Sequence, residues 1–158
     1  MLDLVATGFR PIIEQTFTKA YGPSWMDVVQ AEKEAATGKA GLASVTDPQF
    51  LLNAAWHHWN QTLGRILGPA ERNYVAELRD TRNRWAHTDA AKPFTTDDVY
   101  RACDTGERLL KAVSAPGADD LTKLKLQVLR EGYDQATKQE VRKVAATPTI
   151  TGTPVAGL

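Results

Sequence analysis

Apolar side chains recur at helical spacing through most of this sequence, and that period is the strongest constraint on its fold. An amphipathic helix repeats its apolar residues every three or four positions, whereas a half-buried strand alternates apolar and polar residues. The sequence contains no stretch with convincing alternation, no internal repeat and no phosphate-binding glycine loop. It therefore predicts an all-α fold, a bundle of about four to five long helices with a short accessory helix.

Proline, glycine and capping residues delimit the first helices. We expect a helix over residues 2–20, and Pro11 should kink it or start a second segment, because proline lacks a backbone donor. Ser24 followed by Asp27 predicts a capping box for a short helix over residues 25–36. A loop should follow over residues 37–45, which include two glycines.

The next two helices are predicted to be long and adjacent. Asp47 and Pro48 are typical of a helix start, and the apolar face that follows runs to Gly68, a C-terminal stop. Pro69 then opens another helix, and so short a break should make the two helices antiparallel neighbours. On the first of them we expect core indoles and solvated histidines: Trp56 and Trp59 inside, His57 and His58 outside.

The C-terminal part is predicted as two helices and a linker. Thr95 and Asp98 form a second capping box pattern, and Pro116 should end the helix that it begins. A last helix over residues 119–145 becomes highly charged, and the sequence after it has linker composition. We expect three parts: a helical bundle at 1–116, a charged helix packed on it at 117–145, and a linker toward a missing C-terminal region at 146–158.

Composition limits the partners and the cellular location that we expect for this protein. The 19 basic and 19 acidic residues balance, so affinity for nucleic acid would have to come from a local cluster. Cys103 is alone and forms no intrachain disulfide, which fits a reducing cytosol. No segment approaches the roughly 18 apolar residues of a membrane span. We expect a cytoplasmic protein without membrane contact, and the sequence shows no ligand cluster for a metal and no cofactor motif.

The basic cluster lies in residues 78–87, which contain Arg79, Arg82, Arg84 and His87. On a helical wheel Arg82 falls inside an apolar stripe, although an unpaired guanidinium is costly to bury. A neighbouring polar stripe repeats at i, i+4 and i+8, and its members are Arg79, Asn83 and His87. Arginine for an anion and histidine for proton transfer indicate chemistry on a phosphodiester.

The order of these residues resembles the HEPN superfamily, whose signature is arginine, a polar residue, three variable residues and histidine near a helix end. Arg82, Asn83 and His87 supply that pattern here. The surrounding sequence is similar to the subfamily shared by a yeast RNA-surveillance endoribonuclease and the N-termini of large bacterial defence ATPases and helicases. The matching stretches are Asp80–His87, Pro93–Ala102, Glu107–Leu110 and the tryptophan-bearing segment Asn53–Asn60, within about residues 1–115.

The resemblance implies a HEPN-like bundle that acts as a metal-independent endoribonuclease in phage defence. Two signature helices would meet across a two-fold axis, so that RNA is cut at a site composed by a homodimer. Arg82 would bind the scissile phosphate, His87 would transfer a proton, and Asn83 would orient the imidazole or the phosphate. Arg79 and Arg84 would be supporting phosphate contacts. The partners implied are RNA, a C-terminal ATPase region of a longer chain, or other defence-system proteins.

Alternatives stand beside each assignment. Arg84 is also placed to pair with Asp80 on the helix surface, and His87 with the helix dipole. Trp85 is expected to lie in the core or in a dimer interface rather than to stack on an RNA base. The main alternative function is a non-catalytic dimerisation or regulatory module for a C-terminal ATPase. Nucleotide binding is a third alternative, supported only by the arginines.

Overall fold

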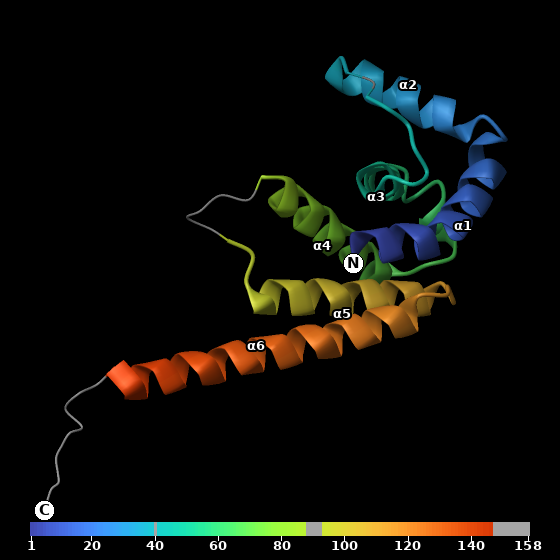
Figure 1. Ribbon diagram of the computed structural model, residues 1–158. Coiled ribbons are helices and arrows are strands. Elements are labelled where there is room, and N and C mark those ends of the chain that lie inside the picture. The colour runs from blue at the N-terminus through green and yellow to red at the C-terminus, as the bar shows by residue number, and fades with distance from the viewer. Residues whose placement is uncertain (40, 88–92, 147–158) are drawn as a thin grey trace, which may run out of the picture.

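The computed structural model describes residues 1–39, 41–87 and 93–146, and this part of the chain is helical with no strand. Its elements are α1 (Leu2–Tyr21), α2 (Trp25–Thr37), α3 (Pro48–His57), the 3-10 helix η1 (Leu63–Arg65), α4 (Pro69–Ala86), α5 (Thr96–Ala112) and α6 (Ala118–Ala146). The all-α prediction is confirmed (Figure 1). The expected linker, apart from Ala146, lies outside the described residues, as does the loop at 88–92.

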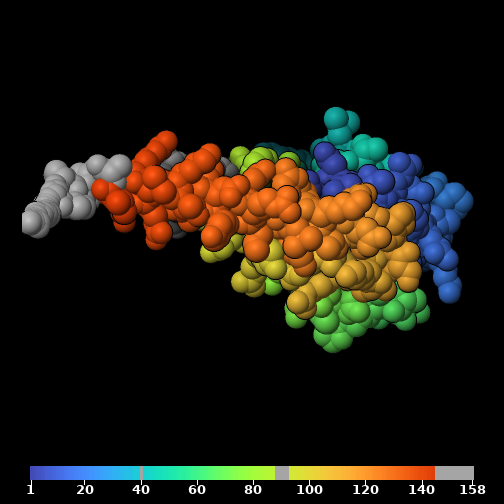
Figure 2. All heavy atoms as spheres, turned by 60° about the horizontal axis from the view of Figure 1, so that its bottom comes forward, coloured from blue at the N-terminus to red at the C-terminus, as the bar shows by residue number. Residues whose placement is uncertain are grey.

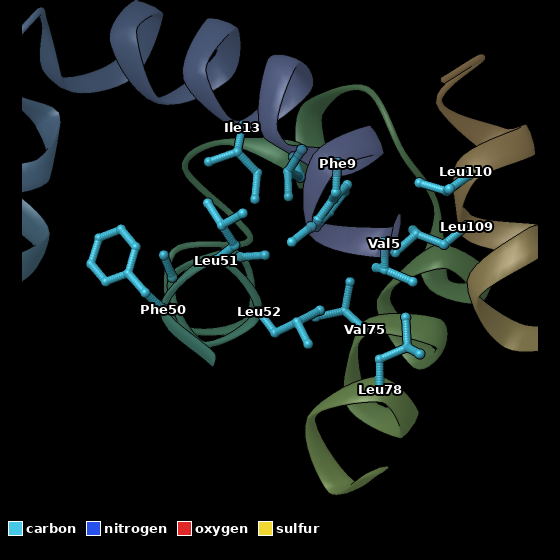
Figure 3. Close-up of a cluster of buried hydrophobic side chains, with 14 of the residues drawn as sticks. Val5, Phe9, Ile13, Phe50, Leu51, Leu52, Val75, Leu78, Leu109 and Leu110 are labelled. Carbon is cyan, nitrogen blue, oxygen red and sulfur yellow. The ribbon is translucent and has the colours of Figure 1, made fainter. Parts of the chain in front are cut away.

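The core lies where α1, α3, α4 and α5 converge (Figure 3). Each helix contributes fully buried side chains, among them Phe9, Leu51, Leu78 and Leu109. Burying a side chain of this size contributes about 1.5–3 kcal/mol. Gly8 allows α1 to approach α5 closely, because a Cβ there would lie 2.7 Å from Leu110 Cδ2. α4, the helix that carries the candidate site, is anchored in this core by its two buried residues, Val75 and Leu78.

The predicted helix over 47–68 is wrong in its second half, since α3 ends at His57. Thr62 Oγ1 donates to the His58 carbonyl at 2.6 Å, and the Gly64 amide donates to the Trp59 carbonyl at 2.7 Å. These bonds turn the chain back, so that Trp59 and Leu63 are both buried. The short break predicted before Pro69 is consequently a longer connection, although α3 and α4 still pack side by side.

His58 is buried, contrary to the expectation of a solvated ring. Its Nδ1 lies 2.9 Å from Tyr21 Oη, and its Nε2 lies 3.3 Å from a carboxylate oxygen of Glu32. The ring is satisfied on both edges, which is what a buried polar group requires. Because α3 ends at His57, His58 falls in the turn and faces α1 and α2. His57 remains exposed, as expected.

Helix ends were predicted with mixed success. The Asp47 cap and the Thr95–Asp98 capping box are both formed. The expected box at Ser24 is not, because the Ser24 side chain makes no capping bond. Pro11 does not divide α1, which is continuous. Pro11 and Thr7, whose carbonyl would have been its partner, both lie on the exposed face, where solvent can satisfy that carbonyl.

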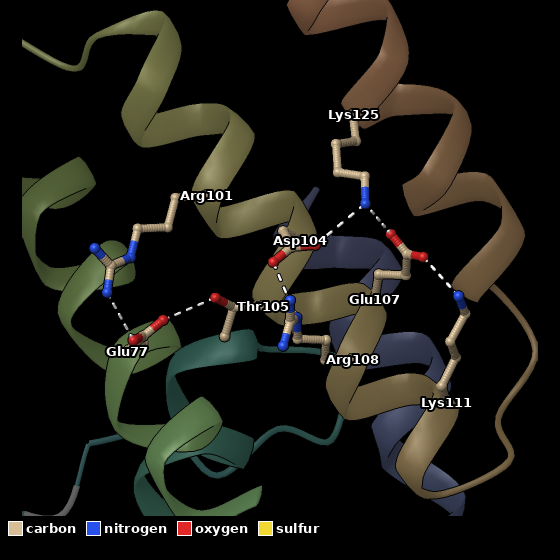
Figure 4. Close-up of polar contacts among 8 residues, drawn as sticks. All are labelled: Glu77, Arg101, Asp104, Thr105, Glu107, Arg108, Lys111 and Lys125. Carbon is tan, nitrogen blue, oxygen red and sulfur yellow. Dashed lines mark hydrogen bonds and ion pairs between the residues drawn. The ribbon is translucent and has the colours of Figure 1, made fainter. Parts of the chain in front are cut away.

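α6 packs along α5, and its distal part projects past the end of the bundle (Figures 1 and 2). A polar cluster centred on the buried Glu107 joins the two helices (Figure 4). Glu107, only 7% exposed, pairs with Lys111 at 2.7 Å and with Lys125 at 2.8 Å. Lys125 also reaches Asp104 at 3.1 Å. The hydrogen bond from Lys111 and then the contact with Lys125 hold the Glu107 pKa at about 2.

This cluster predicts a loss of stability in acid. The Glu107 pKa is depressed in the folded state, so its contribution is present above about pH 4.5 and lost as pH falls to about 2. Glu107→Gln should lower the free energy of unfolding by about 2–3 kcal/mol near neutral pH. The difference between variant and parent should shrink in acid, as measured by urea unfolding. Glu14→Gln, which breaks an exposed pair with Arg10, is the control and should cost under about 1 kcal/mol.

Candidate active site

α4 is oriented by polar contacts to α5 as well as by its buried leucine and valine. Glu77 accepts a hydrogen bond from Thr105 Oγ1 at 2.8 Å and pairs with Arg101 at 3.0 Å (Figure 4). The Thr105 hydrogen bond, and then Arg101, lower the pKa of Glu77. These contacts tie the middle of α4 to α5, one to two turns before the candidate site.

The HEPN-like residues lie at the C-terminal end of α4. His87 directly follows the final helical residue, and its backbone amide donates to the carbonyls of Asn83 at 3.1 Å and Arg84 at 3.2 Å. The His87 and Asn83 side chains are exposed, and Arg82 is half-buried. The structure therefore presents a histidine and an amide at an open helix end, with an arginine partly enclosed beside them.

Arg84 faces α5 rather than Asp80, so the predicted pair within the helix is wrong. Its Nη2 lies 3.2 Å from Asp98 Oδ2, and its guanidinium lies 4.8 Å from the centre of the Phe94 ring. The Asp98 pKa is lowered, first by the Thr95 backbone amide and then by Arg84. Asp98 thus caps α5 and ties the end of α4 to it. A phosphate-binding role for Arg84 stays a prediction, and the geometry favours a positioning role.

Trp85 does not continue the buried stripe of Val75 and Leu78. Its side chain is 63% exposed and meets the Phe94 ring edge to face, with centroids 5.4 Å apart. The buried stripe ends at Leu78, because the last turns of α4 extend past the core. The sequence predicted Trp85 in the core or in a dimer interface. The described residues do not bury it in the core, and its role in an interface stays a prediction.

Arg79 is held by α3. Its Nε donates to Asn53 Oδ1 at 2.9 Å, and its guanidinium lies 5.4 Å from the centre of the Trp56 ring. Burial lowers the Arg79 pKa. Trp56, expected in the core, is only half-buried, and Arg72 also lies over it at 4.6 Å. The sequence interpretation missed Arg72, although its spacing of i, i+7 from Arg79 places both on one helix face.

The two sides of α4 differ in charge balance. The groove toward α5 is lined by Glu77, Asp80 and Asp98, and its two arginines, Arg84 and Arg101, are paired with carboxylates. In contrast, no carboxylate of the described residues lies within the 4.0 Å ion-pair distance of three other arginines of α4. These are Arg72, Arg79 and Arg82. A phosphate would meet uncompensated positive charge at these three residues.

Other site types find little support in the part of the chain that the structure describes. It contains no group of three His, Cys, Asp or Glu side chains placed to hold a metal ion. None of its helices has the length and apolar character needed to cross a membrane. Cys103 is buried, and burial raises the pKa of its thiol, which disfavours a reactive thiolate.

An all-helical bundle with arginine, asparagine and histidine near an open helix end is the arrangement that the HEPN resemblance predicted. The sequence model of the Swt1-like HEPN family matches residues 1–114, so the chain belongs to this family. Membership implies an RNase-type function and confirms the resemblance drawn from the sequence. No curated protein and no solved structure matches the chain. The match ends before α6, so that helix lies outside the family's shared part.

Proposed function

We propose that this domain is a metal-independent endoribonuclease whose site is completed by a second copy of the chain. One observation carries the proposal: Arg82 is half-buried without a carboxylate partner among the described residues, and lies on the turn that presents Asn83 and His87. A half-buried guanidinium without a carboxylate partner is a favourable binding group for an anion such as a phosphate. The exposed imidazole of His87, five residues further along the chain, supplies a group that can accept or donate a proton.

The reaction is an intramolecular transfer within the RNA strand. The ribose 2′-oxygen forms a bond to phosphorus while the bond from phosphorus to the 5′-oxygen breaks. One His87 accepts the proton of the 2′-hydroxyl, and one His87 donates a proton to the leaving 5′-oxygen. Arg82 binds the phosphate and stabilises the charge that develops on it, and Asn83 orients the phosphate or the ring. The products are a 2′,3′-cyclic phosphate and a 5′-hydroxyl.

Helix geometry supports a role for a second copy. Residues five apart on an ideal helix point about 140° away from each other, so one helix presents Arg82 and His87 poorly to one phosphate. Two signature helices related by a two-fold axis bring both residue types to one cleft, because the same surface is used twice. The exposed Trp85 and its neighbour Phe94 provide apolar area beside the signature for such an interface.

The chemistry is tested by the dependence of cleavage on metal and on the 2′-hydroxyl. Single-stranded RNA should be cut at full rate in EDTA, and the fragments should end in 2′,3′-cyclic phosphate. A strand with 2′-deoxyribose at the cut should be inert, because it lacks the nucleophile. Loss of all cleavage on chelation, with recovery on adding a divalent cation, would contradict the proposal.

Assembly is tested by light scattering. The protein should be a dimer at tens of micromolar, and Trp85→Ala should shift it toward monomer, since interface aromatics often dominate binding energy. Tyr133→Ala is the control, because Tyr133 is also an exposed aromatic, 72% exposed, but lies on α6 and not on the signature helix. A monomeric parent protein, or dissociation by Tyr133→Ala alone, would count against a site shared across the signature helices.

We also propose that the domain is the N-terminal part of a larger ATPase-containing phage-defence protein. The resemblance to the N-termini of defence ATPases supports this setting, as does a charged helix, α6, that continues past the family's shared part and projects from the bundle (Figure 2). In that setting the alternative function is a non-catalytic dimerisation or regulatory module. The reading frame of the full chain tests the setting, and the RNA assays separate the two functions.

A further inference from the structure

Two cationic side chains of α4 converge on one indole of α3. The Cζ atoms of Arg72 and Arg79 lie 4.6 Å and 5.4 Å from the centre of the Trp56 ring. Both arginines and the indole are half-buried, so the group is open on one side. Asn53 holds Arg79 through its Nε at 2.9 Å, which leaves the two terminal nitrogens of that guanidinium to act as donors.

The positive charge of this group is not balanced nearby. Among the residues that the structure describes, four arginines form ion pairs: Arg10, Arg84, Arg101 and Arg108. Arg72 and Arg79 have no carboxylate within the 4.0 Å ion-pair distance. Asp80 attracts Arg79 electrostatically, but only from beyond that distance. In addition, Arg72 Nε is a buried donor without a hydrogen-bond partner. No protein acceptor therefore competes for the Arg72 guanidinium among the described residues.

The electrostatic effect of the group reaches a neighbouring histidine. His57 has a lowered pKa, first because of burial and then because of Arg79, followed by His58 and Lys33 of α2. The surface between α3 and α4 is therefore positive over more than one side chain. The attraction between a cation and a π face holds each guanidinium in place and leaves its positive charge uncompensated.

The group lies on the same helix as the HEPN signature. Arg72 is fifteen residues before His87, which is about 22 Å along an α-helix, and Arg79 lies between them. The three arginines of α4 that have no carboxylate in range thus form a row that ends at the candidate site: Arg72, Arg79 and Arg82. A strand bound at the site and continuing toward the N-terminus of α4 would meet each of them in turn.

We propose that Arg72 and Arg79, held against Trp56, bind backbone phosphates of the RNA strand outside the cleaved linkage. The inference rests on the proposed function and extends the site toward the N-terminus of α4. The guanidinium groups donate to phosphate oxygens through their terminal nitrogens. Contacts of this type position the strand without reading its sequence. The ligand class is a single-stranded polyanion with phosphates at regular spacing.

The test measures binding in a protein that does not cut its ligand. In the His87→Ala background, fluorescence anisotropy with a labelled single-stranded RNA gives affinity at several salt concentrations. Arg72→Gln and Arg79→Gln should each weaken binding about tenfold, as expected for the loss of a charge-assisted contact. Each should also reduce the slope of log affinity against log salt by about 0.7, the value for one phosphate contact on a single strand. Arg72→Lys should keep the slope, because it keeps the charge.

The control is Arg10→Gln, which makes the same change in net charge at an ion-paired arginine on α1. Equal affinities and equal slopes for Arg10→Gln and the two test variants would overturn the proposal, as would no measurable RNA binding by the parent. Melting temperatures show whether Arg79→Gln still folds. Arg72→Gln breaks no side-chain hydrogen bond among the described residues, so it remains informative if Arg79→Gln does not fold. Failure of the nuclease proposal is a separate result, since it appears as absent cleavage in the wild-type protein and leaves this binding measurement unchanged.

Discussion

Replacing His87 with alanine should reduce RNA cleavage by about 10²–10⁴-fold, the usual contribution of general acid–base catalysis. A composite site would lose both copies of the imidazole, which places the expected loss at the upper end of that range. The fold should be unaffected, because the His87 side chain is exposed and its structural contacts are made by its backbone amide. Initial rates on single-stranded RNA in EDTA, with melting temperature and light scattering on the same samples, measure all three properties.

The other two histidines serve as matched controls. His57 is exposed on α3, so His57→Ala should leave the fold intact and retain cleavage. His58 is buried between Tyr21 and Glu32, so His58→Ala should lower the melting temperature, because it leaves the Tyr21 hydroxyl without its partner. Only His87→Ala should separate activity from stability. Cleavage that survives His87→Ala but is lost in His57→Ala would move the proton-transfer role to α3.

The same experiment separates the nuclease from the regulatory module. A module that only dimerises would show no cleavage in the parent protein and no change in assembly with His87→Ala. A nuclease would show cleavage whose loss in the variant leaves the dimer in place. The outcome that contradicts the mechanism most directly is undiminished cleavage by His87→Ala with unchanged 2′,3′-cyclic ends, because the proposed base and acid would both be absent.

The sequence predicted the helical class because the signals for helices are local. Thr95 and Asp98 lie three residues apart, and their capping box depends only on the backbone between them. The Asp47 cap is equally local. The break after His57 was missed because it is tertiary: the turn allows Trp59 and Leu63 to be buried together, and His58 to meet residues of α1 and α2. An apolar spacing that fits a continuous helix does not contain that information.

In the candidate site too, local features were predicted from the sequence and tertiary contacts were not. That Arg82, Asn83 and His87 share the end of one helix follows from their spacing and from the helix that begins at Pro69. The partner of Arg84 does not follow from it, because Asp98 approaches from α5 across fourteen positions of sequence. The exposure of Trp85 likewise depends on where the core ends, and the contact between Arg72 and Trp56 depends on how α3 packs against α4.

Arg82→Ala should cost little stability and much activity. The half-buried guanidinium has no carboxylate partner among the described residues, so its removal breaks no ion pair, and the melting temperature should stay within about 2 °C. Cleavage should fall by about 10²-fold or more, since a positioned arginine stabilises charge that develops only in the transition state. RNA binding should weaken as well, because the same group holds the phosphate in the ground state.

Arg84→Ala is the matched control, two residues away on the same helix. Arg84 is paired with Asp98 and lies over Phe94, so its loss should loosen the junction of α4 and α5 and lower the melting temperature more than Arg82→Ala does. The ion pair is exposed and is worth up to about 1 kcal/mol, so the expected decrease is a few degrees. The two variants remove equal charge, and a general electrostatic effect on RNA would therefore weaken binding equally in both. A large loss of stability in Arg82→Ala with unchanged RNA binding would assign Arg82 to the architecture, because an arginine that holds the scissile phosphate must affect the RNA before it affects the fold.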